Sequence, residues 1–411
     1  MNETYEQELA HMAVIPDHVP PALVRECPLF SRRVVVENPY ETMIPAIHRG
    51  PSIFYAPGSL PGGRGGWVVR RASDLLTLYS DTDNFHKNGN TRFAKMLGEH
   101  WDVIPTELDP PRHTAFRSAL NPIFSAARMA TLDARVRQRA RELIDRFRDR
   151  GHCDFISEFA VPFPISIFLD LLGLPQENMP LYLKWVDVLL HGSDEQQRIS
   201  GVRVVKNLLM DAIEQRRANP GDDLISQALG LEVNGRKWTD DEVLGYCFNL
   251  YIGGLDTVTT NMGLHFRHLA ESPEQQASLR EHTSLQSPAI EELLRAYAAV
   301  TTQRIVSRPI DFGGVRFMPG DFIAMSTPLA GRDPEEYDHP QSVDFSRQPR
   351  HLSFGRGRHH CLGQHLARRE LQIAFQEFLS QIPSFRVASG AEVPFFIGSI
   401  IHVKRLPLEW H

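Results

Sequence analysis

The feature that most constrains the fold of this 411-residue chain is a single cysteine near the N-terminus of a predicted helix. It follows directly after a loop rich in glycine and arginine. The loop runs from Phe354 to His360, and Cys361 follows it. Residues from Gln364 to Leu379 repeat apolar side chains at helical spacing, which predicts a helix with one buried face. A sulfur at a helix N-terminus meets unpaired N–H groups and the positive end of the helix dipole. These favour the thiolate, the form that binds metals. The predicted buried face consists of Leu371, Ala374, Phe375, Phe378 and Leu379.

The glycines beside Cys361 allow two interpretations. Gly355, Gly357 and Gly363 would let the backbone lie close beneath a flat cofactor, because glycine has no Cβ. The alternative is a buried, unreactive cysteine, which is common for a free cysteine. These residues, taken alone, leave both interpretations open.

Phe354, Gly357, Cys361 and Gly363 have the spacing Phe-x-x-Gly-x-x-x-Cys-x-Gly, which resembles the signature of the cytochrome P450 family. The resemblance implies a mainly α fold with a small β region, a triangular helical prism with haem between a long central helix and the cysteine loop. It also implies haem b (iron protoporphyrin IX) with the Cys361 thiolate as axial ligand, and O₂ as co-substrate. Residues 1–411 are then expected to form a single domain, with 1–40 as a Pro-rich lead-in.

An apolar stretch from Val243 to Leu269, opened by an N-cap signal at Thr239, predicts one long central helix. It contains Gly253-Gly254, and two interior glycines cost about 1 kcal/mol each, so a fold that keeps them needs space there. A glycine pair for helix packing beside a polar kink is the alternative. The resemblance assigns Gly253 to the cofactor site and makes Asp256 and Thr257 the catalytic pair that delivers protons.

Two further charged pairs match the family in the expected order. Glu292 and Arg295, at i,i+3 spacing, can form an ion pair on one helical face, although such a pair is often only a solvated surface pair. The resemblance implies that they hold the cysteine loop, with Arg347 as a third member.

His113 and Arg117, at i,i+4 spacing, suit a carboxylate, although they could be ordinary surface residues. The resemblance implies that they bind a haem propionate, with Arg304 and His359 as further partners.

The chain is most similar to the soluble bacterial camphor hydroxylase group, nearly end to end and least between residues 88 and 100. Trp101 stands where that group has a substrate-binding tyrosine, and an indole N–H is a larger, differently directed donor, so a changed substrate is expected. Asn249 either contacts the substrate or holds an internal water. Apolar walls are expected from Val300, Ile400 and Phe93.

These features predict a monooxygenase that hydroxylates a small apolar terpenoid or norisoprenoid, ionone-like or camphor-like. The chain has neither a Gly-x-Gly-x-x-Gly fingerprint nor a cysteine set for an iron–sulfur cluster. We therefore expect electrons from a 2Fe-2S ferredoxin with its NAD(P)H reductase. A peroxide-driven peroxygenase and a non-catalytic haem sensor or electron carrier remain as alternatives. The ferredoxin would dock near four arginines that could instead be a solvated face: Arg117, Arg356, Arg358 and Arg368.

Composition and charge also bear on the expected partners and cellular location of the protein. Net charge is −6 without a basic tail, so no nucleic-acid partner is expected. Four scattered cysteines suggest a reducing cytoplasm. Met1 to Ala13 holds no apolar run long enough for a signal peptide or anchor, and we expect a cytoplasmic monomer without a membrane partner.

Sequence periodicity and turn residues also predict smaller elements. Helices are expected within Leu132–Arg148 and Val202–Arg217. A hairpin is expected at Asn234-Gly235 and a strand pair within Ile310–Phe317.

Overall fold

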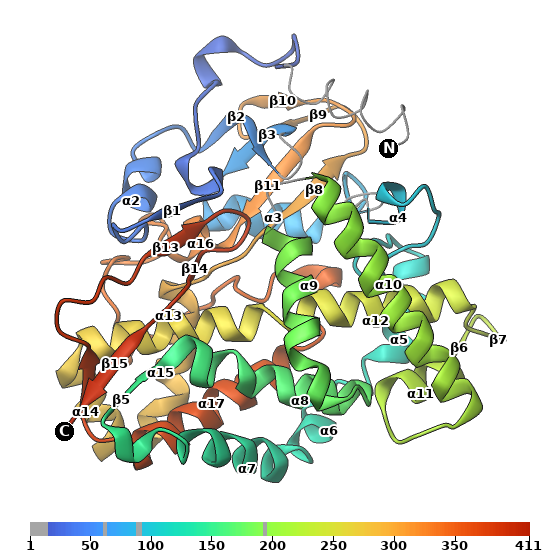
Figure 1. Ribbon diagram of the computed structural model, residues 1–411. Coiled ribbons are helices and arrows are strands. Elements are labelled where there is room, and N and C mark those ends of the chain that lie inside the picture. The colour runs from blue at the N-terminus through green and yellow to red at the C-terminus, as the bar shows by residue number, and fades with distance from the viewer. Residues whose placement is uncertain (1–14, 61–63, 88–92, 192–194) are drawn as a thin grey trace.

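The computed structural model describes residues 15–60, 64–87, 93–191 and 195–411. Helices form most of the molecule, and the largest group of strands lies at one end of it, with smaller strand groups at other edges (Figure 1). The predicted mainly α architecture with a small β region is therefore confirmed. The predictions for Met1–Ala13, and those for 88–92 within the stretch of weakest resemblance, lie outside the described residues.

The helix after the cysteine is α17, which spans Gln364–Gln381. The five apolar side chains predicted for its inner face are all buried. It packs against α7 (Asp133–Ile144), α13 (Thr257–Glu271) and α15 (Gln286–Ala296). A short 3₁₀ turn, Gly357–His359, precedes Cys361. The sequence pattern thus placed this helix correctly, because its apolar repeat matches a real packing face.

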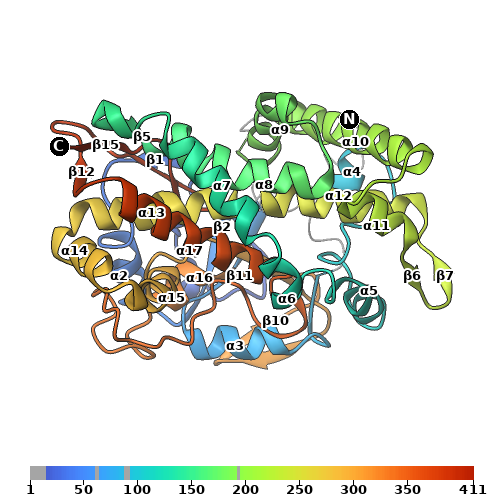
Figure 2. The same cartoon turned by 90° about the horizontal axis from the view of Figure 1, so that it is seen from below.

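The central helix differs from its prediction, because two helices replace the single one. They are α12, Asp240–Gly254, and α13, with a break at residues 255–256. In Figures 1 and 2 the two run nearly in line through the middle of the molecule. The expected N-cap at Thr239 is present as a capping box with Glu242. Two glycines weaken the helix just before the break.

The remaining helices surround this central pair. α8 packs against α12, as do α9, α10 and α11. The helices predicted within 132–148 and 202–217 are confirmed as α7 and as part of α10, with different ends. The bounds are α2 Met43–His48, α3 Ala72–Ser80, α4 Phe93–Met96, α5 Arg112–Leu120, α6 Ala126–Ala130, α8 Pro162–Leu172, α9 Met179–His191, α10 Glu195–Ala218, α11 Leu224–Gly230, α14 Pro273–Glu281 and α16 Thr327–Gly331.

The largest sheet has the strand order β2-β3-β11-β8-β4. β11 is parallel to β3, and the other neighbours are antiparallel. Ala324 of β11 lies opposite Val68 of β3 on one side and Gln303 of β8 on the other. The sheet brings β8 to the centre of the molecule, where it contributes to the site described below. The strands are β2 Ile53–Leu60, β3 Arg64–Val69, β4 Phe85–His86, β8 Thr301–Val306 and β11 Phe322–Ser326.

Both predicted hairpins are confirmed. Asn234 and Gly235 have positive φ angles of 52° and 76° between β6 and β7, as a type I′ turn requires. β9 and β10 pair antiparallel around Gly313-Gly314. The smaller strands are β1 Arg33–Val35, β5 His152–Asp154, β6 Glu232–Val233, β7 Arg236–Lys237, β9 Ile310–Phe312, β10 Val315–Phe317, β12 Phe385–Val387, β13 Phe395–Ile397, β14 His402–Val403 and β15 Pro407–Trp410.

In the part of the chain that the structure describes, none of the helices combines the length and the apolar character that crossing a membrane requires.

Candidate active site

A cavity of about 550 Å³ lies between the junction of α12 and α13 and the cysteine loop. Gly253 and Thr257 line it from the helix junction, and Cys361 and Gly363 line it from the loop and the start of α17. β8 contributes a third wall. The motifs that the sequence analysis singled out, far apart in the chain, therefore face one internal space.

The loop glycines have different structural reasons. Gly355 and Gly357 have positive φ angles of 66° and 69°, which L side chains rarely adopt. A Cβ on Gly357 would also lie 2.5 Å from the carbonyl oxygen of Tyr79, so this glycine allows α3 to approach the loop. A Cβ on Gly363 would meet no atom within 4 Å. Because Gly363 lines the cavity, it leaves room for a flat group beside Cys361.

Cys361 is the cysteine that lines the cavity. Its backbone N–H donates to the carbonyl of Phe354 at 2.9 Å, which fixes the loop at the sulfur. Burial raises the pKa of the Cys361 thiol, while the backbone N–H groups of Gly363 and Gln364 and the guanidinium of Arg117 act in the opposite direction. The helix start thus favours the thiolate as expected, but burial is the larger effect in the protein alone. A bound metal cation would reverse that balance, because a coordinating thiol is deprotonated.

The other three cysteines, Cys27, Cys153 and Cys247, are buried free thiols. Burial is the main cause that raises the pKa of each, to about 12 for Cys27. They fit the role of unreactive core residues.

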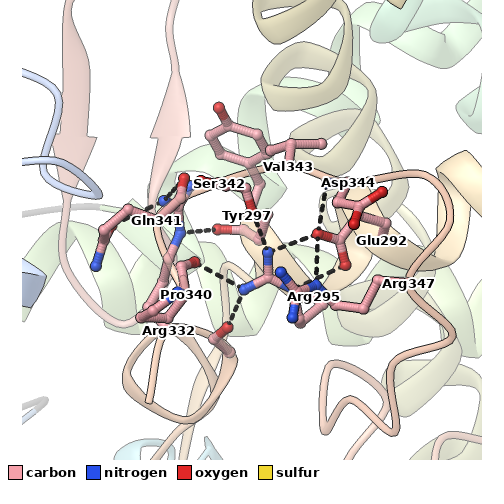
Figure 3. A network of polar contacts seen from close by, with 12 residues as sticks. Glu292, Arg295, Tyr297, Arg332, Pro340, Gln341, Ser342, Val343, Asp344 and Arg347 are labelled. Carbon is pink, nitrogen blue, oxygen red and sulfur yellow. Dashed lines mark hydrogen bonds and ion pairs between the residues drawn. The ribbon is translucent and has the colours of Figure 1, made fainter. Parts of the chain in front are cut away.

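Glu292 and Arg295 form a fully buried ion pair on α15, with Arg295 Nη2 2.7 Å from Glu292 Oε1 (Figure 3). Arg347 Nε lies 3.2 Å from the same carboxylate oxygen, and the backbone N–H of Asp344 donates to it at 3.0 Å. The pair is therefore not a solvated surface pair, and the structure brings all three predicted members together.

Arg295 extends the network beyond the carboxylate. Its guanidinium donates to the carbonyl oxygens of Gly331, Pro340 and Ser342 (Figure 3). The hydroxyl of Ser353, one residue before Phe354, donates to the carbonyl of Leu294 on α15. α15 thus anchors the segment that leads into the cysteine loop.

Four basic side chains line one corner of the cavity: His113, Arg304, His359 and Lys87. The rings of His113 and His359 lie 4.2 Å apart between centroids. Both ring nitrogens of His113 are buried and, within the described residues, have no hydrogen-bond partner. Arg304 donates to the carbonyl of Gln303 and lies over the ring of Tyr79.

The charged groups of this corner are mostly basic, although the Asp109 carboxylate lies 3.9 Å from His359 Nε2. Burial, together with the neighbouring His359 and Arg117, lowers the pKa of His113 to about 3. Burial and Arg304 lower the pKa of Lys87 to about 7. Burial and cationic neighbours disfavour the charged form of these groups. A ligand that brings carboxylates next to them would favour the charged form again. The residues present therefore fit a flat cofactor with acidic side groups, as expected for haem.

Arg117 makes contacts that its helical spacing did not predict. It lines the cavity, but its Nη1 donates to the carbonyl of His360 at 2.9 Å and its Nε donates to Asn121. In this arrangement it supports the backbone next to Cys361. The helical spacing placed Arg117 on the correct face of α5 but did not reveal these two acceptors.

The two glycines at the helix junction have different surroundings. A Cβ on Gly253 would meet no atom within 4 Å, so this residue keeps the cavity open. A Cβ on Gly254 would lie 2.5 Å from the ring of Phe168, so Gly254, which also lines the cavity, allows this ring to pack against α12. Thr257 lines the cavity and its hydroxyl donates to the carbonyl of Gly253 at 3.1 Å. Asp256 occupies the N-cap position of α13, next to Thr257.

Four of the five predicted substrate residues line the cavity: Phe93, Asn249, Val300 and Ile400. Val300 and Ile400 form an isolated β-bridge, which joins two parts of the wall.

Trp101, the fifth predicted substrate residue, is placed differently from the other four. Its indole N–H donates to Glu99 at 2.7 Å and its ring packs on Phe248, and it is not among the described residues of the cavity wall. Sequence position identified the segment but not the direction of the side chain.

The four predicted docking arginines differ in exposure. Arg356 and Arg358 are exposed. Arg368 pairs with Glu291 at 2.7 Å, and Arg117 is bonded as described above. Arg356 and Arg358 are therefore the members available to a partner.

Sequence reasoning missed Lys87 and Thr106, which both line the cavity. Neither belongs to a recognisable spacing, because each reaches the site through tertiary packing. Thr106 donates its hydroxyl to Asn249 at 2.6 Å, from a loop 143 residues away in sequence.

Comparisons with known proteins agree with this geometry. A family model described as Cytochrome P450 matches residues 165–395. The probable cytochrome P450 127A1 of Sinorhizobium fredii is 39% identical over 402 residues, which cover 96% of this chain and 97% of that protein. The crystal structures of CYP101J2 and CYP101C1 are 31% and 32% identical, each with a TM-score of 0.85, and cover 97% of this chain and 100% of their own chains.

Proposed function

Because the chain belongs to the cytochrome P450 family, and is therefore a monooxygenase, we propose that it hydroxylates a small, mostly apolar terpenoid or norisoprenoid. The electrons would come from a 2Fe-2S ferredoxin and its NAD(P)H reductase. One observation carries the proposal: Cys361, Thr257 and the basic corner line the same cavity, whose remaining walls include apolar side chains such as Phe93 and Val300.

Different cavity residues would bind different parts of the cofactor. Haem supplies the binding and reductive activation of dioxygen when it is bound. Cys361 provides the thiolate ligand, and Gly363 leaves the space beside it. Arg304, His113 and Lys87 bind and neutralise the carboxylates. The buried Glu292–Arg295 pair keeps the segment before the cysteine in place.

Thr257 and Asp256 deliver protons in this proposal. The hydroxyl of Thr257 lies at the cavity surface with its hydrogen donated to Gly253, which leaves its oxygen free to accept a hydrogen bond from a group in the cavity or from water. Asp256, the next residue toward the helix break, can pass a proton toward this hydroxyl. The break between α12 and α13 frees these groups from the regular helical ladder.

The apolar walls orient the substrate and exclude water. Phe93, Val300 and Ile400 offer no hydrogen bonds, so they favour hydrocarbon surface over polar molecules. Water exclusion also keeps the protons that pass Thr257 directed to the reaction.

The ferrous–CO difference spectrum of the purified protein tests the cofactor assignment. A red-shifted Soret band is expected for the wild type, and its loss is expected in Cys361→Ser. A wild-type protein that binds haem without that band would contradict the thiolate assignment.

Turnover assays separate the proposal from its alternatives. Product formation with a ferredoxin, its reductase and NAD(P)H supports a monooxygenase, and Asp256→Asn should slow that turnover at least 10-fold. Turnover with peroxide alone would favour a peroxygenase. If β-ionone and camphor both leave the ferric spectrum unchanged, the proposed substrate class would be wrong.

A further inference from the structure

A partly buried hydrogen-bonded pair contributes a polar group to the cavity wall. Asn249 lies on α12, four residues before Gly253, and Thr106 lies in the loop before α5. The Thr106 hydroxyl donates to Asn249 Oδ1 at 2.6 Å, and both residues line the cavity. The loop and α12 are also joined by a hydrogen bond from the backbone N–H of Ile104 to the carbonyl of Gly245 at 3.2 Å. The side-chain contact between Thr106 and Asn249 adds to this bond and fixes the amide plane.

We propose that Thr106 holds Asn249 so that its amide N–H₂ forms a fixed donor site for an oxygen of the substrate, such as a ketone carbonyl. The inference rests on the proposed function, because it assumes that this cavity binds the substrate. It makes the substrate class more specific: an oxygenated rather than a pure hydrocarbon terpenoid or norisoprenoid.

The chemistry of the amide supports this orientation. Its oxygen is occupied by the Thr106 hydroxyl, and the nitrogen has no hydrogen-bond partner among the described residues. The nitrogen is therefore the group left to meet a ligand. A donor on the cavity wall that has no protein partner can bond a ligand oxygen, which then gains affinity and a defined orientation.

The surroundings make this donor selective. Neighbouring wall residues such as Phe93, Ile252, Val300 and Ile400 are apolar. The indole of Trp101, which the sequence had suggested as the donor, is bonded to Glu99. The basic side chains near Arg304 lie at the corner that fits the cofactor carboxylates, so they do not compete for the substrate.

The opposite orientation of the amide makes a different prediction. If Asn249 donated to Thr106, its oxygen would face the cavity and would repel a ketone oxygen. Comparing a ketone with its hydrocarbon counterpart therefore distinguishes the two orientations, because the hydrocarbon can neither donate nor accept.

The test uses the haem-loaded full chain and two probes, camphor and bornane, which differ by one carbonyl oxygen. Dissociation constants come from the shift of the ferric Soret band on titration. In the wild type the ketone should bind about 10-fold more tightly than the hydrocarbon. Asn249→Leu should remove this preference. Asn249→Asp, which presents an acceptor, should reverse it.

Two Thr106 variants test whether the hydroxyl positions the amide. Thr106→Val should lower the ketone preference several-fold, and Thr106→Ser, which keeps the hydroxyl, should retain it. The ferrous–CO spectrum and the melting temperature of each variant verify that the protein is folded and loaded.

The possible outcomes distinguish failure of the donor site from failure of the proposed substrate class. Equal preference for the ketone in the wild type and in Asn249→Leu, or a wild-type preference for bornane, would overturn the donor site while leaving the proposed function intact. The absence of a spectral shift with camphor, bornane and β-ionone alike would overturn the substrate class and the donor site together.

Discussion

At the scale of single residues, the basic corner of the cavity combines burial with like charge. Lys87 is buried next to Arg304, and both effects lower its pKa to about 7, well below the ordinary value of 10.5. His113 has two buried ring nitrogens without a hydrogen-bond partner in the described chain. Burying either side chain without a partner costs free energy, and a nearby carboxylate would offset that cost.

Lys87→Met should therefore accelerate haem loss, about 5-fold or more, because one charge-assisted contact is removed. Carboxylates raise the Lys87 pKa above 7, so haem binding takes up a proton in the range from about pH 7 to 10. Affinity must then fall as pH rises through this range. Transfer of haem to excess apomyoglobin, followed at the Soret band at pH 7 and pH 9, measures both effects.

Lys237→Met, at an exposed position of β7, serves as the matched control. Equal haem-loss rates in the two variants would contradict a role for Lys87 at the carboxylates. An unchanged pH dependence in Lys87→Met would show that other groups take up the proton.

Residue-scale prediction from the sequence worked where chemistry and spacing coincide. Cys361 could be singled out because its loop, its helix and its glycines are contiguous in sequence. The orientation of Trp101 could not be predicted, because sequence position says nothing about the Glu99 carboxylate that accepts from the indole. Lys87 and Thr106 left no local pattern, since they reach the cavity only through the tertiary fold.

At the scale of elements, the junction of α12 and α13 shows how helix propensity and cavity shape combine. The apolar periodicity predicted a continuous helix, and it continues across the break, so periodicity alone could not reveal the interruption. The glycine pair was visible in the sequence. Both glycines line the cavity, but only Gly254 is in close contact with Phe168 from α8, and the sequence could not place that ring.

Gly253→Ala and Gly254→Ala form a matched pair that tests this difference. Gly254→Ala should lower the free energy of unfolding by about 1–3 kcal/mol, because its Cβ would collide with the Phe168 ring and the core must shift. Gly253→Ala should be neutral or stabilising by up to about 1 kcal/mol, since alanine favours a helix. Its methyl group enters the cavity and should weaken ligand binding instead.

Urea unfolding of the haem-loaded protein and Soret titration with camphor measure the two effects separately. Equal destabilisation by both substitutions would contradict the assignment of Gly253 to the cavity.

The Glu292 network acts between α15 and the segment that leads to the cysteine. Glu292→Gln leaves the buried Arg295 and the neighbouring Arg347 without their carboxylate, so it should destabilise the protein by about 3–5 kcal/mol. Asp311→Asn breaks an exposed pair with Arg316 and should cost less than about 1 kcal/mol. Urea unfolding compares the two, and similar small effects would show that the buried network is not required for stability.

At the scale of the whole molecule, the fold class was predicted from the motif around Cys361. Three further motifs, around His113, Gly253 and Glu292, precede it in the expected order. The five-stranded sheet shows what remained unpredictable. β11 pairs in parallel with β3, more than 250 residues earlier in the chain, and no local pattern encodes such a pairing. The extension of one domain over all 411 residues stays a prediction. The cavity itself arises only after the sheet, the central helices and the cysteine loop have come together.

Net charge is −6, yet Arg356 and Arg358 are exposed on the loop that carries Cys361. A local positive surface on an acidic protein can steer an acidic ferredoxin to the cysteine side, and such steering weakens with salt. Arg358→Glu should therefore raise the KM for ferredoxin about 10-fold at low ionic strength, and the difference should shrink toward unity near 0.5 M salt.

Arg316→Glu, on the exposed face of β10 and outside the cysteine loop, controls for the change in net charge. Dithionite reduction of Arg358→Glu followed by CO binding should match the wild type, because it bypasses docking and reports only the intact cofactor site. If Arg358→Glu and Arg316→Glu raised the KM equally, the whole-molecule charge and not this loop would govern the encounter. A KM that did not change with salt in the wild type would remove the electrostatic argument for docking at this face.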